Sequence, residues 1–150
     1  MTKQEYEHIR NLAWKLLIDA NITKLPTSIT QIAKLYNLQN KMDYNRSRFE
    51  NCKIISHEIL LLFGLPSSDS AIKMLAVRLM APLIILKECK ISSAEQLSNL
   101  TQIPYYLCQQ RIKRLDTKIQ QKTFEISNME TNLKAQFKQF IDEYLNNFPK

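Results

Sequence analysis

Two neighbouring residues, His57 and Glu58, have the types and the order that metal-dependent hydrolysis requires. In the helical pattern H-E-x-x-H, two histidines one turn apart bind zinc, and the glutamate takes a proton from the metal-bound water. The sequence here is ISHEILLLFG, and Leu61 stands where the second histidine belongs. These residues alone favour a histidine at the start of an apolar helix, with Glu58 as an acid of its first turn.

A second candidate for chemistry is the basic segment 109–122, which contains Arg111, Lys113, Arg114, Lys118 and Lys122. Residues 93–122 together have the pattern of a helix-turn-helix, whose second helix contacts DNA. The apolar residues of this second helix also fall at core spacing, so the charges are equally explained as a solvated face. We favour the solvated face and keep DNA binding by Arg111, Lys113, Arg114 and Lys118 as the alternative.

The composition limits the classes of protein to which the chain can belong. With Gly64 as its one glycine, it lacks the loops of a P-loop or dinucleotide-binding fold and favours helices. Its net charge of +7 permits an acidic partner, DNA included, without requiring one. Three cysteines, Cys52, Cys89 and Cys108, show no C-x-x-C spacing, which argues against a disulfide framework or a zinc ribbon. The charged N-terminal residues and short apolar stretches predict a cytoplasmic protein with no membrane partner.

Hydrophobic periodicity predicts a mainly helical chain with one small sheet. The expected helices are, in order, 2–20 with a capping box of Thr2 and Glu5, 28–35, 53–64 ending at Gly64, and 69–88 with a kink or split at Pro82. They are followed by one helix from a Ser92–Glu95 capping box, one from Pro104, and one over 128–147 after a capping box of Ser127 and Glu130. The polar segment 39–52 alternates weakly, which predicts a short strand or an edge hairpin. The predicted fold class is therefore mainly α, formally α+β with a reduced sheet.

Several segments in sequence order carry a resemblance to a known family. They are LPTSITQIAKLYNL, SHEIL, LAVRLMAP and SAEQLSNLTQIPYYLCQQRIKRL. In this order and spacing, from Tyr6 to Leu115, the chain resembles the ImmA/IrrE family of HExxH metallopeptidase-like proteins, which are common on phages and mobile elements. The resemblance implies an ImmA/IrrE-like domain over 1–122 and a C-terminal helical extension over 123–150.

The resemblance also implies roles for the candidate metal-site residues. It makes His57 the first ligand and Glu58 the general base, while Leu61 and Ala71 occupy the positions of the other two ligands. A degenerate site of this kind does not hold zinc tightly, so we expect neither a cofactor nor catalysis. Zinc belongs to a third option, an active peptidase that uses an unusual ligand set such as His57, Asp69 and a cysteine.

The function that the resemblance implies is that of a pseudopeptidase. Such a protein keeps the scaffold of the family to bind a protein regulator or repressor of a phage or mobile element, and no longer cleaves it. The alternative from a different class is a small basic regulator that binds DNA through residues 93–122.

The last expected helix bears an apolar and aromatic stripe, made of Met129, Leu133, Phe137, Phe140, Ile141 and Tyr144. A stripe of this size has to be buried against some surface, because aromatic side chains are costly to leave in water. We favour packing on the chain's own domain. The alternative is an interface with a partner or a second copy, formed by Phe137, Phe140 and Tyr144.

Overall fold

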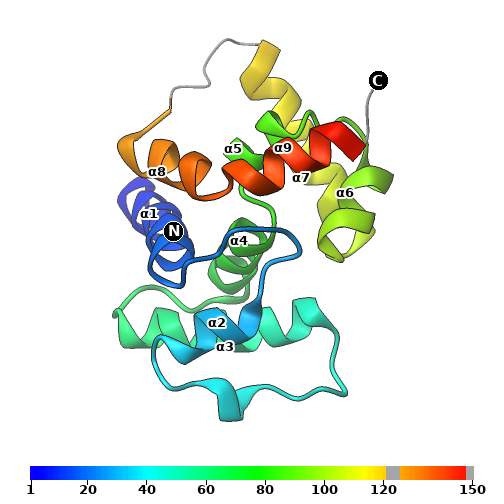
Figure 1. Cartoon of the computed structure of the whole chain (residues 1–150). Helices are drawn as coiled ribbons and strands as arrows, with labels where there is room; N and C mark the ends of the chain where they lie inside the picture. The colour runs from blue at the N-terminus through cyan, green and yellow to red at the C-terminus, as the bar shows by residue number, and fades with distance from the viewer. Residues whose placement is uncertain (121–125, 148–150) are drawn as a thin grey trace.

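The computed structural model of the chain describes residues 1–120 and 126–147, and these residues form helices and loops without a strand (Figure 1). The elements are α1 (Lys3–Asp19), α2 (Ile29–Lys34), the 3₁₀ helix η1 (Gln39–Lys41), α3 (Arg48–Leu62), α4 (Asp69–Met80), α5 (Leu83–Glu88), α6 (Ala94–Thr101), α7 (Tyr105–Gln120), α8 (Asn128–Gln136) and α9 (Lys138–Asn147). None of these helices is long and apolar enough to cross a membrane. Lys122 of the basic segment and the expected boundary between residues 122 and 123 lie outside the described residues.

The small sheet that the sequence predicts is absent from the described residues, so the α+β assignment is wrong there. Residues 39–52 contain the single turn of η1, a loop and the start of α3. One side chain, that of Asn51, explains how the loop is held without a strand partner. Its amide nitrogen donates to the carbonyl oxygen of Asp43 at 2.9 Å, and its amide oxygen accepts from the N–H of Asp43 at 3.0 Å. Backbone groups that a neighbouring strand would satisfy are thus satisfied by a side chain.

Capping side chains determine where several helices begin. The expected capping boxes at Thr2 and Ser127 are both present. Ser47 caps α3, because its hydroxyl accepts from the N–H of Glu50 at 3.1 Å. The helix therefore begins at Arg48 rather than at residue 53.

The single glycine ends α3, as the sequence predicts. Gly64 has a φ of +64°, in the left-handed region that side chains other than glycine adopt at a cost. The following N–H, that of Leu65, donates to the carbonyl oxygen of Leu60 at 3.0 Å and closes the last turn.

The helix expected over 69–88 is split at Pro82, which confirms the predicted break. Proline has no N–H to donate and pushes the preceding residue away from helical geometry. Ala81 accordingly has an extended φ of −139°, and α4 ends one residue before it. The carbonyl oxygen of Ala81 is thereby left outside any helix and is free to accept a bond from another part of the chain.

The helix expected over 128–147 is two helices, α8 and α9, with a turn at Phe137. α8 packs against α1, and α9 reaches α6, where Nε2 of Gln96 donates to the hydroxyl of Tyr144 at 2.8 Å (Figure 1). One straight helix could not contact both α1 and α6. The turn lets the two halves of the stripe pack on different neighbours.

α4 lies near the centre of the molecule and packs against both α1 and α3 (Figure 1). α6 packs against α7, and α7 in turn contacts α5. The buried apolar residues form one cluster that includes Leu16 of α1, Leu75 of α4 and Leu133 of α8. This arrangement brings α1, the end of α4 and α7 together, and their polar side chains meet there.

Candidate functional site

The side chains expected at the vestigial metal site do not line one common cavity. His57 and Asp69 do line the same cavity, which lies between α3 and α4 and has a volume of about 440 Å³. Glu50 also lines this cavity. Leu61 is not among its lining residues and is 54% exposed. Ala71 is fully buried in the core. Of the two positions that the resemblance assigns to the other ligands, one thus lies on the surface and the other lies inside the protein.

The donor set around His57 does not suit zinc. Within 1–120 and 126–147, no three His, Cys, Asp or Glu side chains gather closely enough to hold a metal ion, whereas catalytic zinc uses three protein ligands. All three cysteines are buried thiols. Glu58, the expected general base, is ion-paired with Lys41, with 3.9 Å between Oε1 and Nζ. The described residues therefore do not fit zinc, the metal that HExxH proteins bind.

Side-chain hydrogen bonds hold α6 against the start of α7, in the segment expected as a helix-turn-helix. Ser93 caps α6 in place of Ser92, because its hydroxyl accepts from the N–H of Gln96 at 3.1 Å. The carboxylate of Glu95 accepts instead from the hydroxyl of Tyr105 at 2.6 Å. The predicted capping box of Ser92 and Glu95 is therefore wrong: Ser93 is the N-cap residue, and Glu95 links the two helices.

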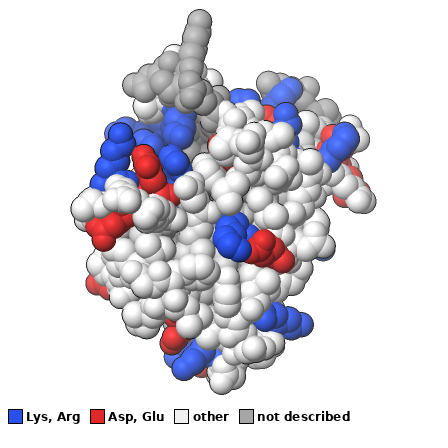
Figure 2. Space-filling model, turned by 90° about the vertical axis from the view of Figure 1, so that its left-hand side faces the viewer, with Lys and Arg blue, Asp and Glu red and all other residues white. Residues whose placement is uncertain are grey.

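The basic residues of α7 that were candidates for DNA contact do not share one exposed face. Arg111 is 8% exposed and Lys118 is half-buried, whereas Lys113 and Arg114 are exposed. Lys113 lines a cavity beside Glu95, away from the cavity that Arg111 and Arg114 line. Figure 2 shows one face of the molecule, which is largely uncharged, with Lys and Arg in small separate groups. A broad basic surface for a duplex is not visible on that face.

The three aromatic residues proposed as a partner interface pack on their own chain. Phe137 is fully buried in the core, and its ring centroid lies 6.2 Å from that of Phe140. The rings of Phe140 and Tyr144 lie 6.0 Å apart, and both residues are half-buried. The aromatic stripe is therefore largely buried within the molecule, and Phe137 has no exposed surface that a partner could contact.

A cluster of cations forms where α1, α4 and α7 meet, and the sequence analysis did not identify it as one site. Arg10 comes from α1 and Arg78 from the last turn of α4, while α7 supplies Arg111, Arg114 and Lys118 at spacings of three and four residues. Residues at these spacings lie on one helix face. Two adjoining cavities, of about 440 and 350 Å³, share Arg78 and Arg111 among their lining residues. We call the two cavities together the arginine cleft.

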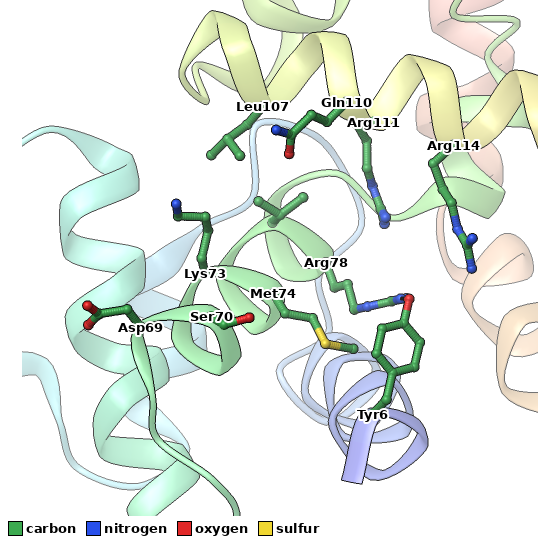
Figure 3. A pocket seen from close by; sticks show the side chains of 11 residues that line it. Tyr6, Asp69, Ser70, Lys73, Met74, Arg78, Leu107, Gln110, Arg111 and Arg114 are labelled. Atoms are coloured by element: carbon green, nitrogen blue, oxygen red, sulfur yellow. Dashed lines mark hydrogen bonds between the residues drawn. The ribbon is translucent and has the colours of Figure 1, made fainter. Parts of the chain in front are cut away.

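Two arginines of the cleft, Arg78 and Arg111, each make one side-chain hydrogen bond (Figure 3). Nε of Arg111 donates to the carbonyl oxygen of Ala81 at 2.8 Å, the acceptor that the break at Pro82 exposes. Nη2 of Arg78 donates to the hydroxyl of Tyr6 at 2.6 Å. Nε of Arg78 and Nε of Arg10 are buried without a hydrogen-bond partner among the described residues. Unpaired buried donors of this kind are rare in folded proteins and call for an explanation.

The described carboxylates near the cleft make no ion pair with its four arginines. In the first cavity, Asp69 lies at the end away from Arg114 in Figure 3. In the second, the carboxylate of Glu130 accepts from the N–H of Ser127 and completes the capping box of α8. Among the described residues that line the cleft, four arginines therefore stand against two carboxylates.

Burial is the main cause of the lowered pKa values of the cations in the cleft, and repulsion between them adds to it. Burial, with the charge of Arg78 added, lowers the pKa of Arg111 to about 9, which leaves it charged at neutral pH. Burial likewise lowers the pKa of Arg78 and of Lys118. Burial opposes ionisation of the Tyr6 phenol, but the charges of Arg78 and Arg114 outweigh it and lower its pKa. Negative charge brought into the cleft would stabilise every one of these cations.

One signal in the sequence could have located the cleft. Arg78 interrupts the apolar stretch 74–86, and a charge within an apolar helix face is unusual unless it has a partner or a function. The hydrogen-bond partner of Arg78, Tyr6, lies 72 positions away in the sequence. Nothing local connects those two residues.

Comparison of the chain with protein-family models, with curated proteins and with solved structures gives no match. The ImmA/IrrE resemblance therefore stays a prediction. The geometry of the site defines its class. It is a cationic cleft in which unpaired guanidinium donors lie beside an apolar wall.

Proposed function

We propose that the chain is a binding protein and that the arginine cleft binds a phosphate-bearing anion. Arg111 carries the proposal. It is a cation with 8% exposure, it makes one hydrogen bond to a backbone carbonyl, and its two terminal nitrogens have no recorded partner among the described residues. A buried charge without a counter-charge is costly, and a bound anion removes that cost.

The shape of the donors favours phosphate over a simple halide or a neutral ligand. A guanidinium group presents parallel N–H donors that match two oxygens of a phosphate or carboxylate. Arg78 and Arg111 line both cavities, so an anion at their junction can contact both side chains. Arg10, Arg114 and Lys118 add charge around it.

The pseudopeptidase proposal, which follows from the ImmA/IrrE resemblance, assigns the chain a protein regulator as partner. What supports binding rather than hydrolysis is the residue set near His57, since Leu61 and Ala71 carry no ligand atom. This proposal and the cleft are compatible, because none of these three residues lines the cleft. The chain could not use the cleft residues to replace a zinc ligand, since guanidinium groups repel a metal cation.

A second candidate function is DNA binding through α7, which the exposure of Lys113 and Arg114 favours. Arg111 argues against DNA binding, because its side chain faces the interior and donates a hydrogen bond to the carbonyl oxygen of Ala81. Arg114 belongs to both candidate sites, but Lys113 lies outside the cleft and Arg111 lies inside it. One pair of variants therefore separates them.

The test is isothermal titration calorimetry of the full chain with inorganic phosphate and with pyrophosphate at fixed ionic strength. We compare Arg111→Met with the matched control Lys113→Met, which removes a charge two residues away on the same helix. A lost hydrogen bond to a charged group corresponds to about 1.5–3 kcal/mol, so Arg111→Met is expected to weaken binding by about 10- to 100-fold. Lys113→Met should bind as the unaltered chain does.

Two results would contradict the phosphate-binding proposal. One is the absence of saturable binding of both anions at low salt. The other is an equal loss in the two variants, which would reveal general electrostatic attraction rather than a site. If duplex DNA binds in a manner that Lys113→Met weakens and Arg111→Met does not, the second candidate replaces the first.

A further inference from the structure

Three arginine side chains converge at one end of the first cavity of the arginine cleft. Arg78, Arg111 and Arg114 line this cavity, and in Figure 3 their side chains point toward one another. Burial is the main cause of the lowered pKa of Arg111, and the charges of the other two arginines add to it, because the three groups lie close together. An anion at this end can therefore accept hydrogen bonds from more than one guanidinium group, a geometry that suits phosphate oxygens.

The rest of the first cavity has an apolar wall. Met74 and Val77 come from α4 and are half-buried, and Leu107 comes from α7 and is buried. The cavity has a volume of about 440 Å³, which is in the range of pockets that bind small organic molecules. An apolar group that covers this wall removes apolar surface from water and so stabilises the complex.

The polar residues of the same cavity leave its apolar wall uncovered. Asp69, Ser70 and Gln110 are exposed, and the carboxylate of Asp69 points away from the cavity in Figure 3. Nζ of Lys73 lies 5.7 Å from the ring centroid of Tyr106, within the range of a cation–π contact. A ligand group that lies along the wall therefore meets mainly apolar side chains, and hydroxyl groups buried against it would lose hydrogen bonds to water.

We propose that the ligand of the cleft is a phosphate monoester of a small apolar alcohol. Its phosphoryl group lies among Arg78, Arg111 and Arg114, and its hydrocarbon group lies along Met74 and Val77. The two ends of the first cavity thus match the two ends of one amphipathic molecule. This inference rests on the phosphate-binding function proposed above and specifies the ligand of that same site.

The experiment is calorimetry of the full chain with inorganic phosphate, propyl phosphate, hexyl phosphate and glycerol phosphate at fixed ionic strength. Propyl phosphate and glycerol phosphate have the same carbon skeleton and differ only in hydroxyl groups, so this pair isolates the effect of polarity. Burial of each methylene group corresponds to about fourfold in affinity. Hexyl phosphate is therefore expected to bind about tenfold or more tightly than inorganic phosphate, and propyl phosphate more tightly than glycerol phosphate.

Two variants of the apolar wall test where the hydrocarbon group lies. Met74→Gln keeps the length of the side chain and makes its end polar, and Val77→Thr keeps the shape of the side chain. Each should reduce the advantage of hexyl phosphate over inorganic phosphate by about threefold and leave the binding of inorganic phosphate unchanged. Met42→Gln, at a half-buried methionine outside the cleft, is the matched control and should change neither.

The outcomes separate this inference from the function on which it rests. If inorganic phosphate binds but hexyl phosphate binds no more tightly, or if propyl and glycerol phosphate bind equally, the apolar assignment is overturned and phosphate binding stands. A preference for hexyl phosphate that survives both Met74→Gln and Val77→Thr, or that Met42→Gln reduces to the same extent, overturns the placement of the hydrocarbon group and with it the proposal. If none of the four anions binds, the proposed function itself fails.

Discussion

The hydroxyl of Tyr6 accepts a hydrogen bond from Nη2 of Arg78 at 2.6 Å, across 72 positions of sequence. The guanidinium group also lies 5.1 Å from the centroid of the Tyr6 ring, within the range of a cation–π contact. One aromatic side chain of α1 thus orients the arginine that both cavities of the cleft share. The contact fixes the donor before any ligand arrives.

Tyr6→Phe tests this contact. The variant keeps the ring and removes the acceptor, so the protonated Arg78 loses a hydrogen bond and unfolding should become easier by about 1.5 kcal/mol. Phosphate should reduce that deficit, because a ligand oxygen can replace the phenol oxygen. Urea denaturation with and without phosphate measures both effects. A deficit that phosphate does not change would place the ligand away from Arg78.

Anion binding should weaken above a pH of about 9. The pKa of Arg111 is lowered to about 9 in the folded protein, so the side chain carries its charge below that pH and loses it above. A bound anion favours the charged form, and affinity should be level between pH 7 and 8 and then fall. Calorimetry across this range measures the effect. The Arg111→Met variant should bind the anion weakly at every pH, without a fall in affinity near pH 9. If that variant shows the same fall, a group other than Arg111 causes it.

The same pKa also predicts the sign of a stability change. A base whose pKa is lower in the folded than in the unfolded chain takes up a proton on unfolding between the two values. The contribution of Arg111 to the free energy of unfolding therefore increases as the pH rises through about 9. Arg111→Met removes this contribution, so the difference in stability between the variant and the unaltered chain should itself depend on pH in that range.

The three cysteines should be unreactive in the folded protein. Burial raises the pKa of Cys52 and of Cys89 to about 12, and it also raises that of Cys108. Thiolates are the reactive form, so a thiol reagent at pH 8 should react slowly with the native chain and rapidly with all three thiols in denaturant. A thiol that reacts rapidly without denaturant would show that one of these sites opens.

Removal of the C-terminal helices should destabilise the whole molecule. Truncation after Ile126 deletes Leu133 and Phe137, which are fully buried, and Gln136, whose amide donates to the carbonyl oxygens of Leu17 and Ile22. Thermal denaturation should show a melting temperature many degrees lower, or aggregation. A truncated chain that keeps its stability but loses self-association would support the interface hypothesis instead.

A single substitution in that region gives a finer measurement. Phe137→Ala should lower the free energy of unfolding by about 3–5 kcal/mol, as large core truncations do. Phe140→Ala, at a half-buried position three residues on, should cost distinctly less. Similar costs at the two positions would contradict the burial difference between them.

Leu61→His should create a metal response that the unaltered chain lacks. His57 and position 61 are one turn apart on α3 and both are exposed, so two imidazoles could share one metal ion. Zinc should then raise the melting temperature of the variant, since a ligand bound only to the folded state stabilises it. The unaltered chain should melt at the same temperature in zinc and in chelator. If zinc raises the melting temperature of the unaltered chain, the conclusion that its donor set does not fit zinc is wrong.

The sequence by itself determined the features that depend on near neighbours in the chain. The capping boxes at Thr2 and Ser127, the break at Pro82 and the helix end at Gly64 follow from bonds and steric limits that span three to five residues. Each of these predictions needed only helical geometry and the chemistry of a single side chain.

The tertiary structure alone decided which side chains meet across long separations. The segment 39–52 avoids a strand because Asn51 satisfies the backbone of Asp43, and weak alternation of polar and apolar residues could not reveal this bond. The arginine cleft depends on Tyr6, Arg78 and Arg111 being brought together from three helices by burial of their apolar neighbours. Periodicity gives the face of a helix on which a residue lies, but it does not give the helix that this face will meet.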